Sequence, residues 1–152
     1  QFSAPRTKYK ISVDIGERFP LHGGAASKVL LAFLPAAIRE AYLRSNLESF
    51  TSNTLTNPMR LAETLTQIRR DRVAYDNEEV EEGIMAVAFP VLDAAHDVVC
   101  ALSVPFIVRT TGAQDDLARI AAAAKSTTLE ISRELGAAVE EGSYPAHMGV
   151  TV

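Results

Sequence analysis

The sequence predicts an α/β fold of the α+β type, in which helices flank an antiparallel β-sheet. Residues 83–104, GIMAVAFPVLDAAHDVVCALSV, form two apolar runs separated by a short polar turn, which is typical of a hairpin. Stretches with helical spacing of apolar residues lie before and after this hairpin. The chain has 152 residues, of which 47% are hydrophobic and 22% charged. This is enough for one sizeable core, so we expect one domain over residues 1–152.

The hairpin strands are expected over Ile84–Leu92 and Val98–Val104, because both runs are rich in Val, Ile and Leu and too short for a pair of helices. Alternate side chains of a strand point to opposite faces. Ala86 therefore lies on one face of the first strand, and Ser103 and Pro105 share a face of the second. Both faces are mostly apolar, so we expect central strands that are covered on each side.

Before the hairpin, one strand and three helices are expected. The alternation over Tyr9–Ile15 predicts a strand with one polar face. Helix-forming runs cover Ala25–Leu34 and Pro35–Ser45, separated only by the proline. A third helix starts with Asn57 as the N-cap and Pro58 at the first helical position.

The remaining elements are a short strand, an acidic loop and a final helix. The strand, Val73–Tyr75, leads into DNEEVEEG, which does not repeat the ligand spacing of a calcium loop. We expect its glutamates to be solvated and Asp76, at the strand end, to face a pocket. The final helix is expected to be capped by Asp115 or Asp116 and to end at Gly142.

Composition and spacing exclude several classes of function. The net charge of -4 argues against nucleic-acid binding by this chain itself. No apolar run approaches the roughly 18 residues of a membrane helix, so no membrane partner is expected. Cys100 is the single cysteine, which fits a reducing cytoplasm. His22, His96 and His147 show no shared metal-ligand spacing, and we expect neither a metal nor another cofactor.

Small residues gather where the first helix begins, from Gly23 to Ala26. Without side-chain bulk there, a ligand can approach the free N–H groups of the first turn, which favour an anion. The alternative is that these residues only let the helix pack tightly on the sheet. The pattern alone does not separate the two.

An enzymatic alternative would use His22 with Asp76, or Cys100, as acid, base or nucleophile. No base and nucleophile pair is visible in the sequence, so we expect no catalytic residues. A further alternative is a pure dimerisation module that binds no ligand.

Three blocks in order resemble the IclR family of bacterial transcriptional regulators: PLHGGAASKVLLAFLP, IRRDRVAYDNEEVEEG and the hairpin sequence. The resemblance spans Phe19 to Val104. It implies the C-terminal effector-binding domain, a GAF/profilin-like antiparallel sheet flanked by helices. Such a domain binds a small metabolite, often a carboxylate, and assembles as a homodimer or homotetramer. It also implies that DNA is bound by a separate winged helix-turn-helix domain. Nothing in this chain matches that domain or the family's first strands, so we expect either that the chain is truncated or cleaved at its N-terminus or that this member departs from the family pattern.

The resemblance also assigns pocket positions. At two of them the family has a polar residue that this chain lacks: Ala86 replaces a cysteine of the family's strand, and Pro105 replaces a serine. We therefore expect a pocket that is more apolar than the family pattern. In it, the N–H groups at the helix start and Ser103 hold the carboxylate of the effector, and the apolar residues contact the rest of the molecule. That part of the effector is expected to be larger than in a small acid, and whether it is aromatic stays open. The expected ligand-binding residues are Gly24, Ala25, Ala26, Asp76, Ala86, Phe89, Ser103 and Pro105.

Overall fold

The computed structural model describes residues 16, 19–108, 113–140, 142 and 144. The expected strand Tyr9–Ile15 lies outside these residues. Three described strands form an antiparallel sheet in the order β1-β2-β3, so the expected α+β fold class is confirmed. The elements are α1 (Ala25–Phe33), α2 (Ala36–Leu43), α3 (Pro58–Asp71), β1 (Ala74–Asn77), β2 (Ile84–Leu92), β3 (Val98–Ile107) and α4 (Ala113–Glu134).

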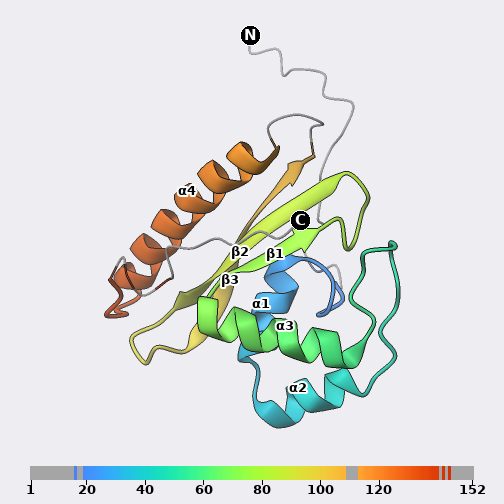
Figure 1. Ribbon diagram of the computed structural model, residues 1–152. Helices are drawn as coiled ribbons and strands as arrows, with labels where there is room; N and C mark the ends of the chain where they lie inside the picture. The colour runs from blue at the N-terminus through green and yellow to red at the C-terminus, as the bar shows by residue number, and fades with distance from the viewer. Residues whose placement is uncertain (1–15, 17–18, 109–112, 141, 143, 145–152) are drawn as a thin grey trace.

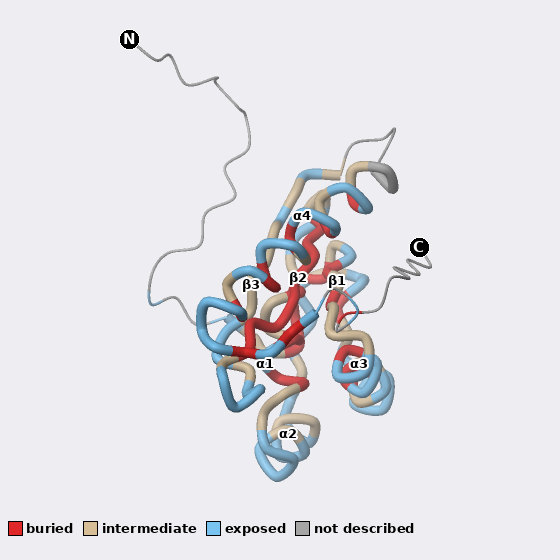
Figure 2. The backbone as a smooth tube through the Cα atoms, turned by 90° about the vertical axis from the view of Figure 1, so that its left-hand side faces the viewer, coloured by how far each residue is buried: buried red, intermediate tan, exposed pale blue. Residues whose placement is uncertain are grey.

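Helices cover both faces of the sheet (Figure 1). Helix α4 packs on one face and α1 on the other, with α3 and α2 beyond α1. Each face has its own hydrophobic core, because alternate residues of β2 supply each one. On the α4 side these residues are Met85, Val87 and Phe89; on the α1 side they are Ala86 and Ala88. Figure 2 shows the buried segments gathered along β2 and the adjoining part of α1.

The central hairpin forms as expected, but its two strands are not equally covered. Met85 to Leu92 are all buried, whereas every residue of β3 is half-buried or exposed. Val99 is 51% exposed and Ile107 40% exposed. Within the described sheet β3 is an edge strand, so the expectation of two strands covered on each side is correct only for β2.

The start of α3 agrees with the sequence. The Asn57 side chain accepts hydrogen bonds from the backbone N–H groups of Met59 (2.9 Å) and Arg60 (3.1 Å), and Pro58 occupies the first helical position. A carboxamide oxygen is a good partner for these otherwise unpaired donors, and proline has no N–H to leave unpaired.

Both expected ends of α4 are wrong. The helix begins at Ala113, before either aspartate, and ends at Glu134 rather than at Gly142. Gly136 adopts φ 88°, and the next backbone N–H, of Ala137, bonds back to the Ser132 carbonyl at 2.9 Å. Glycine reaches this left-handed conformation without steric cost, so the helix stops here.

Pro90 lies in β2, the central strand of the described sheet, and proline is unusual in a central strand. Pairing of β1 with β2 reaches only from Asn77 to Ala74, which lies opposite Ala88. Pro90 therefore lies beyond the end of β1, where its missing N–H breaks no ladder. Its carbonyl accepts a hydrogen bond of 2.7 Å from the Tyr144 hydroxyl.

Candidate functional site

The sheet register brings half of the eight expected ligand-binding residues together. Asp76 lies opposite Ala86, and Ala86 lies opposite Pro105, so these three form one row across the sheet. Ser103 lies in the next row, opposite Ala88. Residues directly opposite one another in antiparallel strands share a face. All of them therefore lie on the face that α1 covers.

The start of α1 lies over this row. Gly24 precedes the helix with φ 79° and ψ 156°, and no side chain caps the helix there. A Cβ on Gly24 would lie 3.3 Å from Cε1 of Phe19 and 3.8 Å from Oδ2 of Asp76. Both the backbone conformation and this close approach require glycine. Ala25 is buried and Ala26 half-buried, so the small residues hold the helix start close to Asp76.

Phe89 does not join the other seven residues. It is 2% exposed and belongs to the core on the α4 side. Its ring packs edge-on against the Tyr144 ring, with 6.1 Å between centroids. Since neighbouring residues of a strand alternate between faces, Phe89 and Ala86 point to opposite sides of β2.

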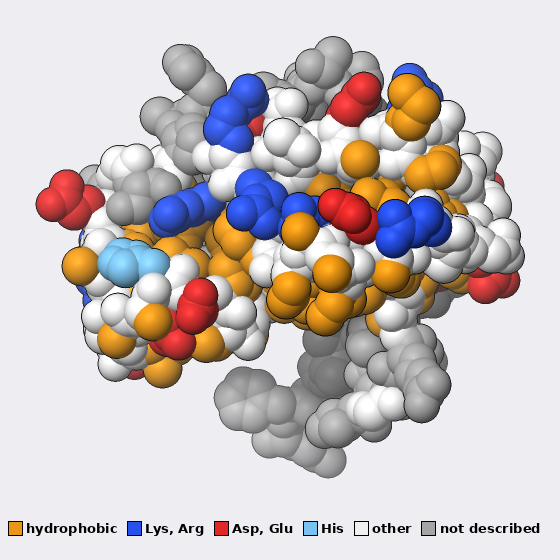
Figure 3. Space-filling view, turned by 90° about the horizontal axis from the view of Figure 1, so that it is seen from below, with side chains coloured by type: hydrophobic (Ala, Val, Ile, Leu, Met, Phe, Trp, Pro, Cys, Tyr) orange, Lys and Arg blue, Asp and Glu red, His pale blue; other side chains and the backbone are white. Residues whose placement is uncertain are grey.

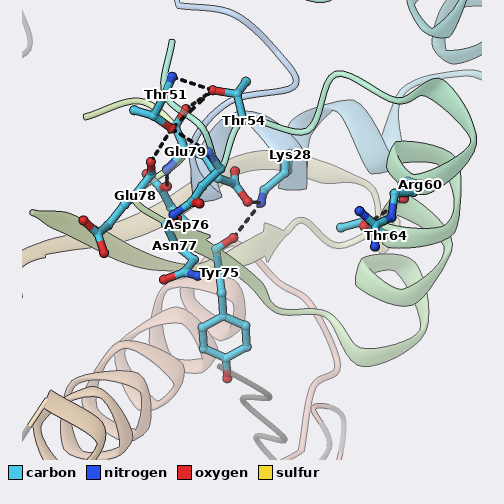
Figure 4. Close-up of polar contacts among 11 residues, drawn as sticks. Lys28, Thr51, Thr54, Arg60, Thr64, Tyr75, Asp76, Asn77, Glu78 and Glu79 are labelled. Atoms are coloured by element: carbon cyan, nitrogen blue, oxygen red, sulfur yellow. Dashed lines mark hydrogen bonds and ion pairs between the residues drawn. The ribbon is translucent and has the colours of Figure 1, made fainter. Parts of the chain in front are cut away.

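A buried ion pair that the sequence analysis missed lies beside the row (Figure 4). Lys28 is 2% exposed and Glu79 6% exposed. The Lys28 Nζ donates hydrogen bonds to the Glu79 carboxylate and, at 2.6 Å, to the Tyr75 carbonyl. The expectation of solvated glutamates is therefore wrong for Glu79. A signal was present, because Lys28 falls among the apolar residues of α1, where a buried charge requires a partner.

The Asp76 carboxylate is also turned inward, with 6% of the residue exposed. Its Oδ1 accepts a hydrogen bond of 2.8 Å from the Glu79 backbone N–H. Burial raises the pKa of Asp76; the Glu79 N–H and then the charge of Lys28 oppose this effect. Burial likewise raises the pKa of Glu79, against the opposing charge of Lys28. Among the described residues, Oε2 of Glu79 is buried without a hydrogen-bond partner.

Two threonines fix the acidic loop that carries Glu79. The Thr51 hydroxyl donates to the Glu78 carbonyl at 2.7 Å, and the Thr54 hydroxyl donates to the Glu79 carbonyl at 2.6 Å. These bonds join the loop to a segment more than twenty residues earlier in the chain (Figure 4). The loop is therefore held in place at Glu78 and Glu79.

His22 is buried and has a structural role. Its Nδ1 lies 2.8 Å from the Tyr42 hydroxyl, and its Nε2 lies 2.8 Å from the Glu48 carbonyl. The Tyr42 oxygen already accepts from the Leu21 N–H at 2.9 Å. It can therefore donate its own hydrogen to Nδ1, while Nε2–H donates to the carbonyl. Both ring nitrogens are engaged in holding this turn together.

The other candidates for chemistry are also placed by the structure. Cys100 is exposed on β3. In the described part of the chain, no three His, Cys, Asp or Glu residues are placed to hold a metal ion. No helix of that part is long and apolar enough to cross a membrane.

A groove of about 450 Å³ lies between α3 and β1, with Lys28 and Glu79 in its lining. None of the eight expected ligand-binding residues lines it. The groove and the row formed by Asp76, Ala86 and Pro105 therefore share no lining residue.

Comparison with known proteins identifies the family. The family described as "Bacterial transcriptional regulator IclR C-terminal" matches residues 2–133. The chain is 37% identical to the HTH-type transcriptional regulator XynR of Escherichia coli (strain K12) over 135 residues, which cover 87% of this chain and 50% of XynR.

Solved structures agree. The chain superposes on Thermotoga maritima IclR with a TM-score of 0.75 and 32% identity, covering 86% of this chain and 53% of that one. It is also similar to the inducer-binding domain of the PobR transcription factor from Acinetobacter, solved as a double mutant with 3-hydroxybenzoic acid. There the TM-score is 0.73 and the identity 25%, over 86% of this chain and 77% of that one. The chain therefore belongs to the IclR family of bacterial transcriptional regulators and matches its C-terminal domain.

Proposed function

We propose that residues 1–152 act as one effector-binding and oligomerisation domain. A small carboxylate binds to it and modulates DNA binding by a separate winged helix-turn-helix domain in the bacterial cytoplasm. The observation that carries this proposal is the row of Asp76, Ala86 and Pro105, with Ser103 beside it, beneath the start of α1. The row and the helix start combine polar groups with apolar walls, as small-molecule sites do.

The proposed ligand contacts follow from the chemistry of each position. The backbone N–H groups of Gly24 to Ala26 and the Ser103 hydroxyl hold the carboxylate. Ser103 is half-buried, and its hydroxyl has no hydrogen-bond partner within the described residues. Ala86 and Pro105 offer apolar surface to the body of the ligand. The complex of the PobR domain with 3-hydroxybenzoic acid supports an aromatic acid as one candidate.

Isothermal titration calorimetry tests this proposal with a panel of acetate, glyoxylate, pyruvate, benzoate and 3-hydroxybenzoate. We expect saturable binding of a larger acid, and binding of only the small hydrophilic acids would contradict the apolar pocket. Ser103→Ala should weaken binding by about 1.5–3 kcal/mol if its hydroxyl contacts a charged carboxylate. Ser126→Ala, at an exposed position on α4, is the matched control and should leave the affinity unchanged.

Failure of every acid to bind or to raise the melting temperature would favour the dimerisation module instead. Self-association is itself supported by exposed apolar side chains, including Ile38 on α2 (53% exposed) and Met59 on α3 (74% exposed). Figure 3 shows hydrophobic side chains gathered on the underside, beside a row of lysines and arginines. Light scattering coupled to size-exclusion chromatography should give the mass of a dimer or tetramer, and a monomer at all concentrations would contradict this part of the proposal.

A further inference from the structure

Two carboxylates of the chain itself already lie at the start of α1. Oδ2 of Asp76 lies 3.8 Å from the position that a Cβ on Gly24 would take. Burial raises the pKa of Glu79, and the charge and hydrogen bond of Lys28, followed by the backbone N–H of Gly24, oppose this effect. Helix α1 has no acidic residue in its own first turn and no side-chain cap. Asp76 and Glu79 therefore supply the negative charge that complements this end of the helix dipole.

The charges around this point do not balance. Lys28 contributes one positive charge from α1, and it is already bonded to Glu79. Asp76 adds a buried carboxylate from β1, and nearby Glu78 in the loop raises the pKa of Asp76 further. On the α3 side, Glu63 and Asp71 line the neighbouring groove, where Asp71 is already paired with Arg70 at 2.7 Å. An incoming carboxylate would therefore meet like charge, which disfavours the ionised state of the whole group.

We infer that Glu79 is a specificity-determining residue of the effector site. Its carboxylate is held by Lys28, in the first turn of α1, beside the N–H groups proposed to hold the ligand, so the site accepts an organic acid together with one proton. This inference rests on the proposed function. The proton comes from solvent and is held by the carboxylate pair of Asp76 and Glu79, so the total charge of the site is the same before and after binding.

The surroundings favour this proton uptake. Both carboxyl groups are buried, and burial raises the pKa of each. A protonated carboxyl group gains an O–H donor, which at Asp76 can point to the ligand's carboxylate. Oε2 of Glu79 has no partner among the described residues, so a proton there breaks no existing hydrogen bond. The Lys28 ammonium remains bonded to the Tyr75 carbonyl throughout.

Calorimetry in two buffers of different ionisation enthalpy, phosphate and Tris, measures the proton uptake directly. With benzoate and pyruvate at pH 7.5, we expect an uptake of about one proton per ligand bound. The Kd should rise about tenfold for each pH unit from 7 to 8.5, since one proton is coupled to binding. Glu79→Gln should reduce the uptake and flatten the pH dependence. Glu81→Gln, at an exposed glutamate of the same loop, should behave as the wild type.

The outcomes separate the two proposals. Binding with no difference between buffers and a constant Kd from pH 5.5 to 8.5 would overturn the proton coupling while leaving an effector site in place. Absence of binding by the wild type at every pH would overturn the effector site and the coupling with it. If Glu79→Gln does not fold, Asp76→Asn provides the second test, because it removes the other carboxylate and should likewise reduce the uptake.

Discussion

Replacing Lys28 by methionine tests how strongly the buried ion pair stabilises the fold. Methionine keeps most of the side-chain volume but removes the counter-charge of the Glu79 carboxylate. Glu79 is only 6% exposed. Removing one partner of a buried pair costs about 3–5 kcal/mol, because the remaining charge stays desolvated. A domain of this size unfolds with about 5–15 kcal/mol. Lys28→Met should therefore remove a large share of the stability at pH 7.5.

Urea titration followed by far-ultraviolet circular dichroism is the suitable assay, since the chain has no tryptophan. The double variant Lys28→Met/Glu79→Gln should be more stable than Lys28→Met alone by about 1–3 kcal/mol, because no uncompensated charge remains. Arg44→Met is the matched control. Its guanidinium lies 3.9 Å from Glu40 in a pair whose side chains are 72% and 62% exposed, so the loss should stay below about 0.5 kcal/mol.

The pH dependence gives a second readout of the same change. Burial raises the pKa of Glu79 in the folded protein, so the folded state binds a proton more readily than the unfolded state. The destabilisation by ionised Glu79 is then present above its folded pKa and disappears as the pH falls toward the unfolded value. Lys28→Met should recover part of its stability between pH 7.5 and pH 5. A loss below about 1 kcal/mol at pH 7.5, or one that is independent of pH, would refute the reasoning.

Two further predictions use the same titration. Tyr75→Phe should leave stability unchanged or raise it by about 1 kcal/mol, because the Tyr75 hydroxyl is buried without a hydrogen-bond partner among the described residues. Burial of this hydroxyl, followed by the charge of Asp71, raises the pKa of Tyr75 to about 12. A clear loss of stability would reveal a hydrogen bond to this hydroxyl. Ser132→Ala should cost about 1–3 kcal/mol, because Ser132 accepts the buried Leu92 N–H at 3.0 Å and donates to the Thr128 carbonyl at 2.8 Å. A loss below about 0.5 kcal/mol, as expected for an exposed serine, would contradict this assignment.

The elements that sequence reasoning predicted well depend on local interactions. The Asn57 cap needs only the next three residues, and the hairpin needs two apolar runs and a short turn. The C-terminal end of α4 was missed because Gly136 and Gly142 are both plausible stops from sequence. The observed choice depends on hydrogen bonds that close around Gly136.

The candidate site was only partly predictable, because it is assembled by strand register. Segment resemblance identified Asp76, Ala86 and Pro105 separately, but only pairing places them in one row. The bond between Lys28 and Glu79 joins residues 51 positions apart. Neither local propensity nor hydrophobic spacing carries information about such a distant partner, although a lysine on the apolar side of a helix indicated that one was needed.

The position of Pro90 also affects how the protein behaves at high concentration. Because β1 stops short of it, the end of β2 would otherwise present an open strand edge to other molecules, and such edges promote aggregation through intermolecular strand pairing. Pro90 offers no donor to an incoming strand, and its acceptor is already bonded to Tyr144. At Pro90, the described part of the chain therefore leaves neither a backbone donor nor an unbonded acceptor for an added strand.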